Sequence, residues 1–212
     1  MRDSSLILSR INAVKKFRLA SGRQATKALA ATPKNFGEIR QPIASYLFIP
    51  KTSSELRQFV PIGFVPSRTI LNNTSLFVDN ATTYEFGILS STMHNAWVRY
   101  TCGRLKSDFR YSAGIVYNNY PWPQDLTDTQ REAVSLAAQG VLDARAVHQK
   151  GKTPASLADL YNPSTMPANL HSAHKALDKA VDAAYGKKRL KTDAERVAYL
   201  FALYAQYTSL LA

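Results

Sequence analysis

The sequence predicts an α+β fold, with a basic N-terminal helix, a mixed, mainly antiparallel sheet with a packed central helix, and an all-helical C-terminal tail. Three observations support this prediction. Apolar residues recur at helical spacing near both ends of the chain. Short runs rich in Val, Ile, Phe and Tyr alternate with turn residues in the middle. Pro-Trp-Pro at residues 121–123 marks a boundary, so we predict domains at residues 1–124 and 125–212.

The composition is that of a globular protein. The chain has 212 residues, of which 45% are hydrophobic and 10% aromatic, enough to bury a core. Cys102 is the only cysteine, which excludes a disulfide scaffold. No apolar run approaches the roughly 18 residues of a spanning helix, and the N-terminus does not match a secretory signal. We therefore expect a soluble, cytoplasmic protein without a membrane partner.

The charge is strongly and unevenly positive. Lys and Arg outnumber Asp and Glu by 27 to 15, a formal net charge of +12. Residues 1–40 hold nine basic and two acidic residues, residues 41–124 seven and four, and residues 125–212 eleven and nine. This excess indicates a polyanionic partner, with nucleic acid first and an acidic membrane surface second. The alternative is a basic protein with a well-solvated surface.

The first half of the chain begins with a predicted helix and continues into strands. Residues 5–31 form the helix, which Pro33 ends. Its apolar stripe consists of Ile7, Ile11, Val14 and Phe17. Three short runs of β-forming residues, separated by turn residues, predict strands near 45–49, 58–65 and 75–78.

A second helix and a charged strand are predicted next. Residues 82–101 carry an apolar stripe at spacings of three and four, and Gly103 ends this helix. The stripe consists of Phe86, Leu89, Met93, Trp97 and Tyr100. Residues 103–112 alternate strictly, which predicts one strand, with residues 113–120 as a partner segment. One face of that strand would carry Arg104, Lys106, Asp108 and Arg110.

The C-terminal tail is predicted to be helical over residues 127–149, 168–185 and 193–211. Thr192 and Glu195 form a capping box at the start of the last helix. The inward-facing residues are predicted to be Leu170, His174, Leu177, Val181 and Tyr185 in the second of these helices, and Val197, Leu200, Phe201 and Tyr204 in the third.

No convincing catalytic, metal or cofactor site is found in the sequence. Both Gly-rich phosphate-binding motifs and the Cys-x-x-Cys motif are absent. His171 and His174 have a spacing that can hold a metal, but no carboxylate completes the set, so no metal is predicted. A Cys102–His94 nucleophile pair is conceivable, yet a free buried cysteine is far commoner. Lysines on the same helix are predicted to pair in water with acidic residues, namely Lys175 and Lys179 with Asp178 and Asp182. These absences favour a binding module.

The predicted charged strand is the sharpest feature. Four charged side chains on one face cannot be buried unpaired, so that face meets water or a polyanion. A β-ribbon fits the DNA major groove, where Lys donates to guanine and Asp accepts from cytosine. Lys106 and Asp108, about 6–7 Å apart along a strand, would suit the two bases of one pair. The alternative is a solvated face with internal ion pairs.

Several segments resemble one known family. The runs are VPIGFVPSRTILNN (60–73), YEFGILSSTMHNAWVRYTCGRLKSDFRYSAGIVYNNYPWP (84–123), LDKAVDAAYG (177–186) and ERVAYLFALY (195–204). They resemble the target recognition region and C-terminal helical domain of fused type II (type IIG/IIL-like) restriction–modification adenine-N6 DNA methyltransferases. Residues 18–33 resemble the segment that leads out of the catalytic domain of such enzymes. The resemblance covers nearly the whole chain.

The resemblance implies site residues and partners. The implied base-reading residues are Lys106, Asp108 and Arg110, with Asn73 and Thr74 in the loop that contains Asn72. Basic residues expected to bind DNA phosphates are Lys51, Arg57, Arg68, Arg99 and Arg104. Duplex DNA and a methyltransferase catalytic domain are the implied partners. The catalytic domain would bind S-adenosylmethionine, because this chain has neither the glycine-rich cofactor motif nor Asn-Pro-Pro-Tyr/Phe; Asn118-Asn119-Tyr120-Pro121 lies in the wrong context.

The sequence therefore predicts a DNA-specificity module of a site-specific adenine methyltransferase, without catalytic residues of its own. The rival interpretation is a non-catalytic adaptor whose basic surface binds an acidic protein or RNA.

Overall fold

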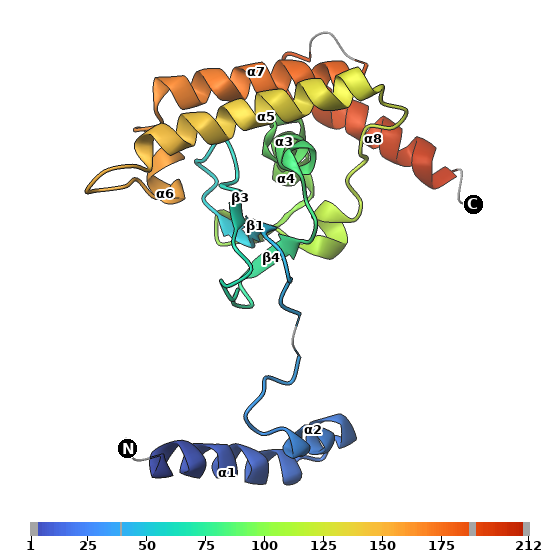
Figure 1. Cartoon of the computed structure of the whole chain (residues 1–212). Helices are drawn as coiled ribbons and strands as arrows, with labels where there is room; N and C mark the ends of the chain where they lie inside the picture. Colours follow the sequence, from blue (N-terminus) through green and yellow to red (C-terminus); the bar gives the residue numbers. More distant parts are fainter. Residues whose placement is uncertain (1–3, 39, 187–189, 210–212) are drawn as a thin grey trace. The chain divides into compact units, whose positions relative to one another are not determined.

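The computed structural model describes residues 4–38, 40–186 and 190–209 (Figure 1). The chain divides into two compact units, residues 1–41 and 42–212. In the described part, no helix is both long and apolar enough to cross a bilayer. The mixture of helices with small antiparallel sheets agrees with the predicted α+β class.

The first unit contains two helices where the sequence predicted one. Helix α1 spans Ser5–Leu19 and α2 spans Gln24–Ala28, followed by a 3₁₀ turn at Leu29–Ala31. The segment after α2 is held against the end of α1, because the Arg18 guanidinium donates to the carbonyl oxygens of Leu29, Thr32 and Asn35, at 2.8–2.9 Å. The apolar stripe of this helix is not buried within the unit, because α1 contains no buried residue and Phe17 is 77% exposed.

The second unit begins with an antiparallel sheet of order β3-β1-β4. Strand β1 spans Tyr46–Pro50, β3 spans Gly63–Val65 and β4 spans Ser75–Val78. The strands predicted near 45–49 and 75–78 are confirmed, and the strand predicted at 58–65 is shorter than predicted. Within residues 58–62 the chain is not a strand, although Phe59 and Ile62 are buried. The Asn95 side chain fixes this segment by accepting a hydrogen bond from the Val60 backbone N–H at 2.8 Å.

The predicted central helix is broken into α3 (Thr83–Ser90) and α4 (Thr92–Thr101). The break occurs at Ser91, which caps α4 by accepting from the His94 N–H. Asp178 accepts from the Thr92 N–H and hydroxyl, both at 2.6 Å, so its predicted pairing with lysine in water is wrong. Four of the five residues of the stripe are buried, but Tyr100 is 60% exposed.

Residues 103–117 differ most from the prediction. Strands β5 (Gly103–Leu105) and β6 (Asp108–Arg110) form a second sheet of order β2-β6-β5, in which β2 spans Thr52–Ser53. The segment predicted as a strand partner instead forms a π-helical turn at Ala113–Tyr117. The Trp97 indole donates to the Val116 carbonyl at 3.0 Å, so the backbone oxygen of Val116 accepts from a helix rather than from a strand.

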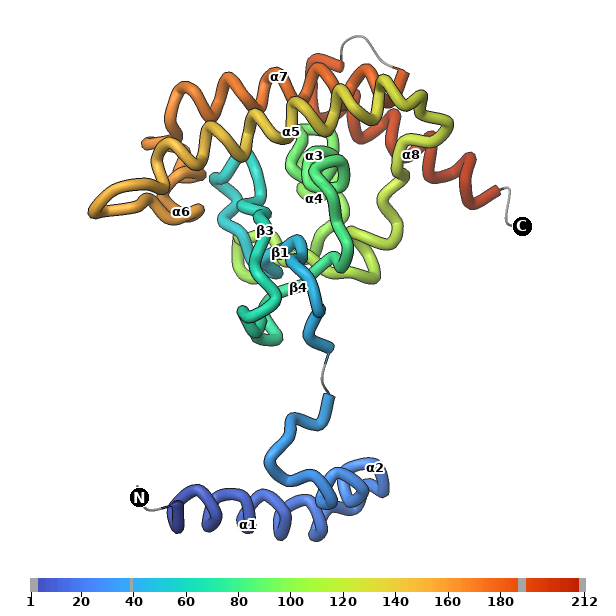
Figure 2. Tube along the Cα trace, in the orientation of Figure 1, coloured from blue at the N-terminus to red at the C-terminus, as the bar shows by residue number. Residues whose placement is uncertain are grey.

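The predicted helical tail is confirmed within the described residues; residues 210 and 211, which the prediction included in the last helix, lie outside them. Its helices are α5 (Asp128–His148), α6 (Leu157–Leu160), α7 (Ala168–Ala184) and α8 (Asp193–Ser209). The two predicted hydrogen bonds of the Thr192–Glu195 capping box are present. The predicted stripe of α7 is buried, whereas Phe201 of α8 is 45% exposed. Figure 2 shows α5 and α7 side by side, covering α3.

The helical tail shares one core with the sheets. Buried side chains before and after residue 124 form a single cluster. Arg145 of α5 is buried and donates to the Ile62 carbonyl at 2.7 Å and to the Tyr161 hydroxyl. Arg196 pairs with Asp182 at 3.2 Å, which replaces the predicted lysine partner of Asp182. The tail is therefore part of the scaffold that holds the sheets.

Gly87 provides a test of the packing between α3 and α5. A Cβ there would lie 3.0 Å from both Ala138 Cβ and Val134 Cγ1. We expect Gly87→Ala to lower the free energy of unfolding by about 1–3 kcal/mol because the core is overfilled. Gly140→Ala is the matched control, because that helical position is open and Ala should stabilise it by about 0.5–1 kcal/mol. Urea unfolding of both variants measures the difference, and equal effects would contradict this packing.

Two buried histidines predict acid sensitivity. Burial lowers the pKa of His94 and of His174 from 6.5 to about 3, so both are neutral in the folded protein. Between these pH values the unfolded chain binds protons that the folded chain does not, so stability falls as pH drops below 6.5. We expect a loss of about 1.4 kcal/mol per pH unit for each histidine, measured by urea unfolding between pH 6.5 and 5. His94→Gln should reduce this slope by one proton, and an unchanged slope in that variant would contradict a buried, neutral His94.

Candidate nucleic-acid interface

The predicted charged strand is a β-hairpin. Strands β5 and β6 pair antiparallel, with Leu105 opposite Asp108 and Arg104 opposite Phe109. Lys106 and Ser107 form the turn, and Lys106 has a φ of 57°, in the left-handed region that favours glycine. Strict alternation is compatible with a long strand and with a tight hairpin. No Gly or Asn marks this turn, so the sequence did not reveal it.

The hairpin distributes the charged residues over different surfaces. Residues opposite each other in a ladder share a face. Arg104 therefore shares the inner face with buried Phe109, and its guanidinium lies 4.3 Å from the centre of that ring. Asp108 and Arg110 lie on the outer face, and exposed Lys106 lies at the tip. The prediction that all four share one face is wrong.

Lys51 joins this hairpin to the loop that contains Asn73 and Thr74. The Lys51 N–H donates to the Thr74 carbonyl at 3.0 Å, and its Nζ donates to the Asn73 carbonyl at 2.7 Å. Its own carbonyl accepts from the Tyr111 N–H at 2.8 Å, directly after β6. Residues far apart in the sequence are thus brought together around one lysine, with Arg110 opposite Thr52 in the ladder.

The loop is ordered by Asn72. Its side-chain oxygen accepts from the Thr74 N–H at 3.1 Å and from the Thr74 hydroxyl at 2.5 Å. Ser75 donates to the same oxygen at 3.4 Å. The Asn73 side chain remains exposed beside this network. Asn72 therefore shapes the loop, while Asn73 and Thr74 form its outer surface.

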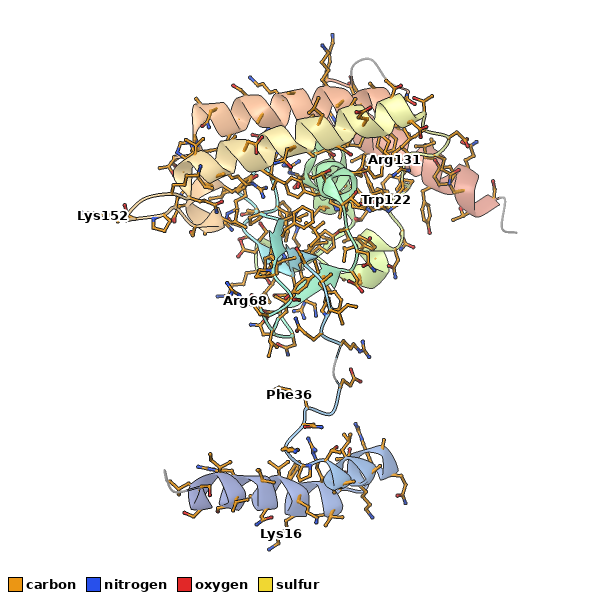
Figure 3. All side chains as sticks on the ribbon, in the orientation of Figure 1. Lys16, Phe36, Arg68, Trp122, Arg131 and Lys152 are labelled. Carbon is orange, nitrogen blue, oxygen red and sulfur yellow. The ribbon has the colours of Figure 1, made fainter. Side chains whose placement is uncertain are left out.

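The predicted phosphate ligands have different environments. Arg99 pairs with Asp193 at 2.7 Å and also donates to the Gln58 carbonyl, which favours an architectural role. Arg104 donates to the Ser107 carbonyl at 2.9 Å and lies 3.7 Å from Glu55. Arg57 is half-buried, whereas Arg68 is exposed at the edge of the second unit farthest from α5 and α7 (Figure 3). Arg68 is therefore the best placed of these arginines for an external anion.

Two positioning residues were missed by sequence reasoning. Asp178 caps α4 from α7, and Arg145 fixes the loop before β3 from α5. A signal for Arg145 was present, because it continues the buried stripe of Val134, Ala138 and Val141 at the next helical interval. A cation on an apolar stripe requires internal partners.

The histidines and tyrosines of the tail are held by internal contacts. His174 stacks on Phe59 with ring centres 3.9 Å apart and forms a hydrogen bond with the Tyr161 hydroxyl at 2.7 Å.

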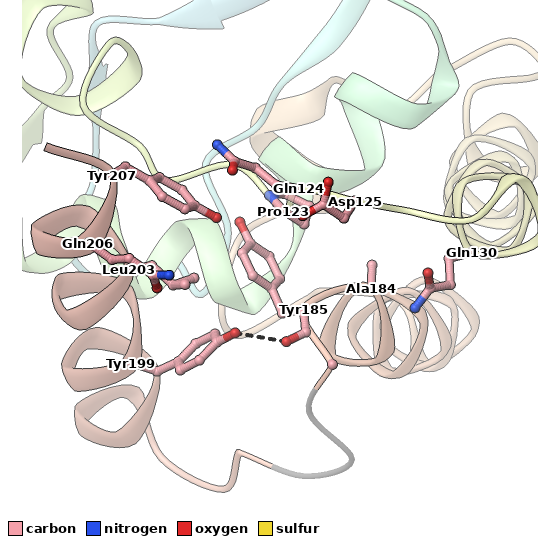
Figure 4. A pocket seen from close by; sticks show the side chains of 11 residues that line it. Pro123, Gln124, Asp125, Gln130, Ala184, Tyr185, Tyr199, Leu203, Gln206 and Tyr207 are labelled. Atoms are coloured by element: carbon pink, nitrogen blue, oxygen red, sulfur yellow. Dashed lines mark hydrogen bonds between the residues drawn. The ribbon is translucent and has the colours of Figure 1, made fainter. Parts of the chain in front are cut away.

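A cavity of about 350 Å³ lies between the start of α5, the end of α7 and α8 (Figure 4). On its wall, Tyr199 donates to the Tyr185 carbonyl at 2.8 Å. Among the described residues, no group of three His, Cys, Asp or Glu side chains is arranged to hold a metal.

Comparison with known families agrees with this geometry. Residues 1–124 match the family described as the MmeI target recognition domain, and residues 126–212 match the MmeI C-terminal domain. The chain belongs to the MmeI target recognition domain family. The two matches together cover every residue of the chain except residue 125.

Two similar proteins are much longer than this chain. DNA methyltransferase A of Bacillus subtilis (strain 168) is 39% identical over 208 residues, which cover 98% of this chain and 23% of the relative. The structure of the Type IIL restriction-modification enzyme MmeI in complex with DNA is 46% identical, with a TM-score of 0.85. That match covers 98% of this chain and 28% of the MmeI chain. The chain thus spans about a quarter of each relative.

The left-handed backbone of Lys106 yields a prediction about strain in this family member. We expect Lys106→Gly to raise the free energy of unfolding by about 1 kcal/mol, because a non-glycine residue pays about 1–2 kcal/mol in this region. Asn80→Gly, with a φ of 53°, is the control and should gain less, because Asn tolerates the conformation better. Urea unfolding compares them, and no gain for Lys106→Gly would show that the turn is unstrained.

Proposed function

We propose that this chain is the sequence-specific duplex-DNA recognition module of a site-specific adenine DNA methyltransferase of the restriction–modification type. The main observation behind this proposal is that the hairpin and the Asn73–Thr74 loop meet at Lys51. The chain that carries this arrangement matches the MmeI structure over 98% of its length. Exposed Lys106 and Arg110 give this surface donors for DNA.

The hairpin would read bases in the major groove. A two-stranded ribbon fits this groove, where Lys and Arg donate to guanine and a carboxylate accepts from cytosine. In this proposal Lys106 and Asp108 read one guanine–cytosine pair from the tip of the hairpin. Arg110, Asn73 and Thr74 read neighbouring bases from the adjoining strand and loop.

Phosphate contacts would supply affinity and register. Arg68 is exposed beside the reading loop, and Lys51, Arg57 and Arg104 lie near the hairpin or the loop that precedes it. Such contacts fix the protein on the duplex without reading sequence. Arg99 is left out of this set because its ion pair with Asp193 holds α4 to α8.

The chemistry of methyl transfer is assigned to another part of a longer protein. This chain offers no Gly-rich loop for S-adenosylmethionine, so the proposal places that cofactor in a catalytic domain, in a cytoplasmic enzyme that flips adenine out of the duplex. Helix α1 carries exposed apolar side chains, including Leu6, Leu8 and Phe17, on several sides. Because a helix that is apolar on most sides is usually buried, α1 would pack against that catalytic domain.

Salt dependence separates this proposal from its alternatives. We expect the chain to bind duplex DNA at micromolar concentration or weaker, with log Kobs falling by about 0.9 per phosphate contact per unit of log salt concentration. Arg68→Ala should reduce the slope by about one contact, and Lys152→Ala, an exposed cation on another loop, should not. Anisotropy titrations with duplex DNA, single strands and RNA provide the measurement. Equal or tighter RNA binding would favour the adaptor interpretation.

A paired substitution tests base reading. Replacing only Lys106 or only Asp108 should lower the binding free energy by about 1–3 kcal/mol at one base pair. The guanine then lacks its donor, or the cytosine lacks its acceptor. Lys106→Glu combined with Asp108→Arg should convert the preferred guanine to cytosine at that position alone. Sequencing of duplexes selected from a random library reads the outcome. Arg104→Ala, on the inner face, should weaken all duplexes alike; an unchanged preference in the double variant would refute base reading by this pair.

A further inference from the structure

The loop between β3 and β4 presents one exposed aliphatic side chain from an anchored backbone. Tyr46, which is fully buried, donates its hydroxyl to the Thr69 carbonyl, and the Thr69 N–H donates to the Pro66 carbonyl at 2.9 Å. On the other side, Asn72 orders the loop through Thr74. Between these anchors Ile70 is 73% exposed. Its backbone position is therefore fixed while its side chain has little protein contact.

The neighbours of Ile70 in this loop are a cation and polar groups. Arg68 is exposed two residues before it, and the surface formed by Asn73 and Thr74 begins three residues after it. A cation, an aliphatic group and polar groups thus follow one another along one short loop. This combination matches the major groove, where phosphates, thymine methyl groups and polar base edges occur close together.

We propose that Ile70 contacts the C5-methyl group of a thymine and thereby adds one specificity determinant to the interface. This inference rests on the proposed DNA-recognition function. An aliphatic side chain distinguishes thymine from cytosine or adenine by burying the methyl group, without a hydrogen bond. The anchors at Thr69 and Asn72 favour this role, because an apolar contact discriminates only when its position is fixed in advance.

Selection with two duplex libraries tests the inference. The full chain selects from one random library that contains thymine and from a second in which uracil replaces thymine and removes only the methyl group. We expect the unaltered chain to enrich thymine at one position in the first library. In the uracil library that enrichment should disappear, while the preferences at all other positions remain. At that position, uracil should weaken binding about three- to fivefold, the effect of burying one methyl-sized group.

Combining the Ile70→Ala substitution with the thymine-to-uracil change gives a double-mutant cycle between protein and DNA. Ile70→Ala should lose the thymine enrichment, and uracil at that position should then cause no further loss of affinity. Leu136→Ala is the matched control, because Leu136 is also 73% exposed but lies on α5. Retained thymine enrichment in Ile70→Ala, or equal losses on thymine and uracil duplexes, would overturn the proposal. Absence of any sequence enrichment with the unaltered chain would refute the recognition function itself, and this inference with it.

Discussion

The hydrogen bonds of Lys51 are the interaction on which the candidate interface depends. Its backbone N–H and carbonyl bond Thr74 and Tyr111, so the chain passes from one sheet to the other at this residue. Its ammonium group closes the same junction by donating to the Asn73 carbonyl. Without these bonds, the loop after β3 and the β5–β6 hairpin would be separate surface segments. A backbone junction of this kind fixes their relative position more firmly than contacts between long side chains.

The helical tail supplies the second constraint, because it satisfies polar groups that the sheets and central helices cannot satisfy alone. Asp178 caps the start of α4, and Asp193 pairs with Arg99 near its end. Arg145 reaches from α5 to the Ile62 carbonyl. Leaving such a buried donor without its hydrogen-bond partner costs about 1–3 kcal/mol, and more for a charged group. The position of the sheets therefore depends on residues that follow them in the sequence.

The sequence predicted elements that are decided locally, and failed where distant contacts decide. Apolar periodicity was sufficient for α5, α7 and α8, and β-forming runs were sufficient for β1 and β4. The apolar pattern could not reveal the break at Ser91. One of the two capped N–H groups at the start of α4, that of Thr92, donates to Asp178, which belongs to α7. The hairpin at Lys106 was hidden for a different reason, since neither Gly nor Asn occupies its turn although Lys106 has a left-handed backbone. The predicted faces of the charged strand were wrong, because the pairing of β6 with β2 and β5 determines which side chains share a face.

The interface separates the side chains that hold the hairpin from those that are available to a ligand. Phe109 and Tyr111 are buried and hold the hairpin to the rest of the second unit. Lys106 and Arg110 are exposed, and no element of the core depends on their side chains. Exchanging the exposed set would therefore change the chemical groups offered to a ligand while the packing that positions them stays intact. In the proposed function, this separation allows one scaffold to recognise different DNA sequences through substitutions at a few outer positions.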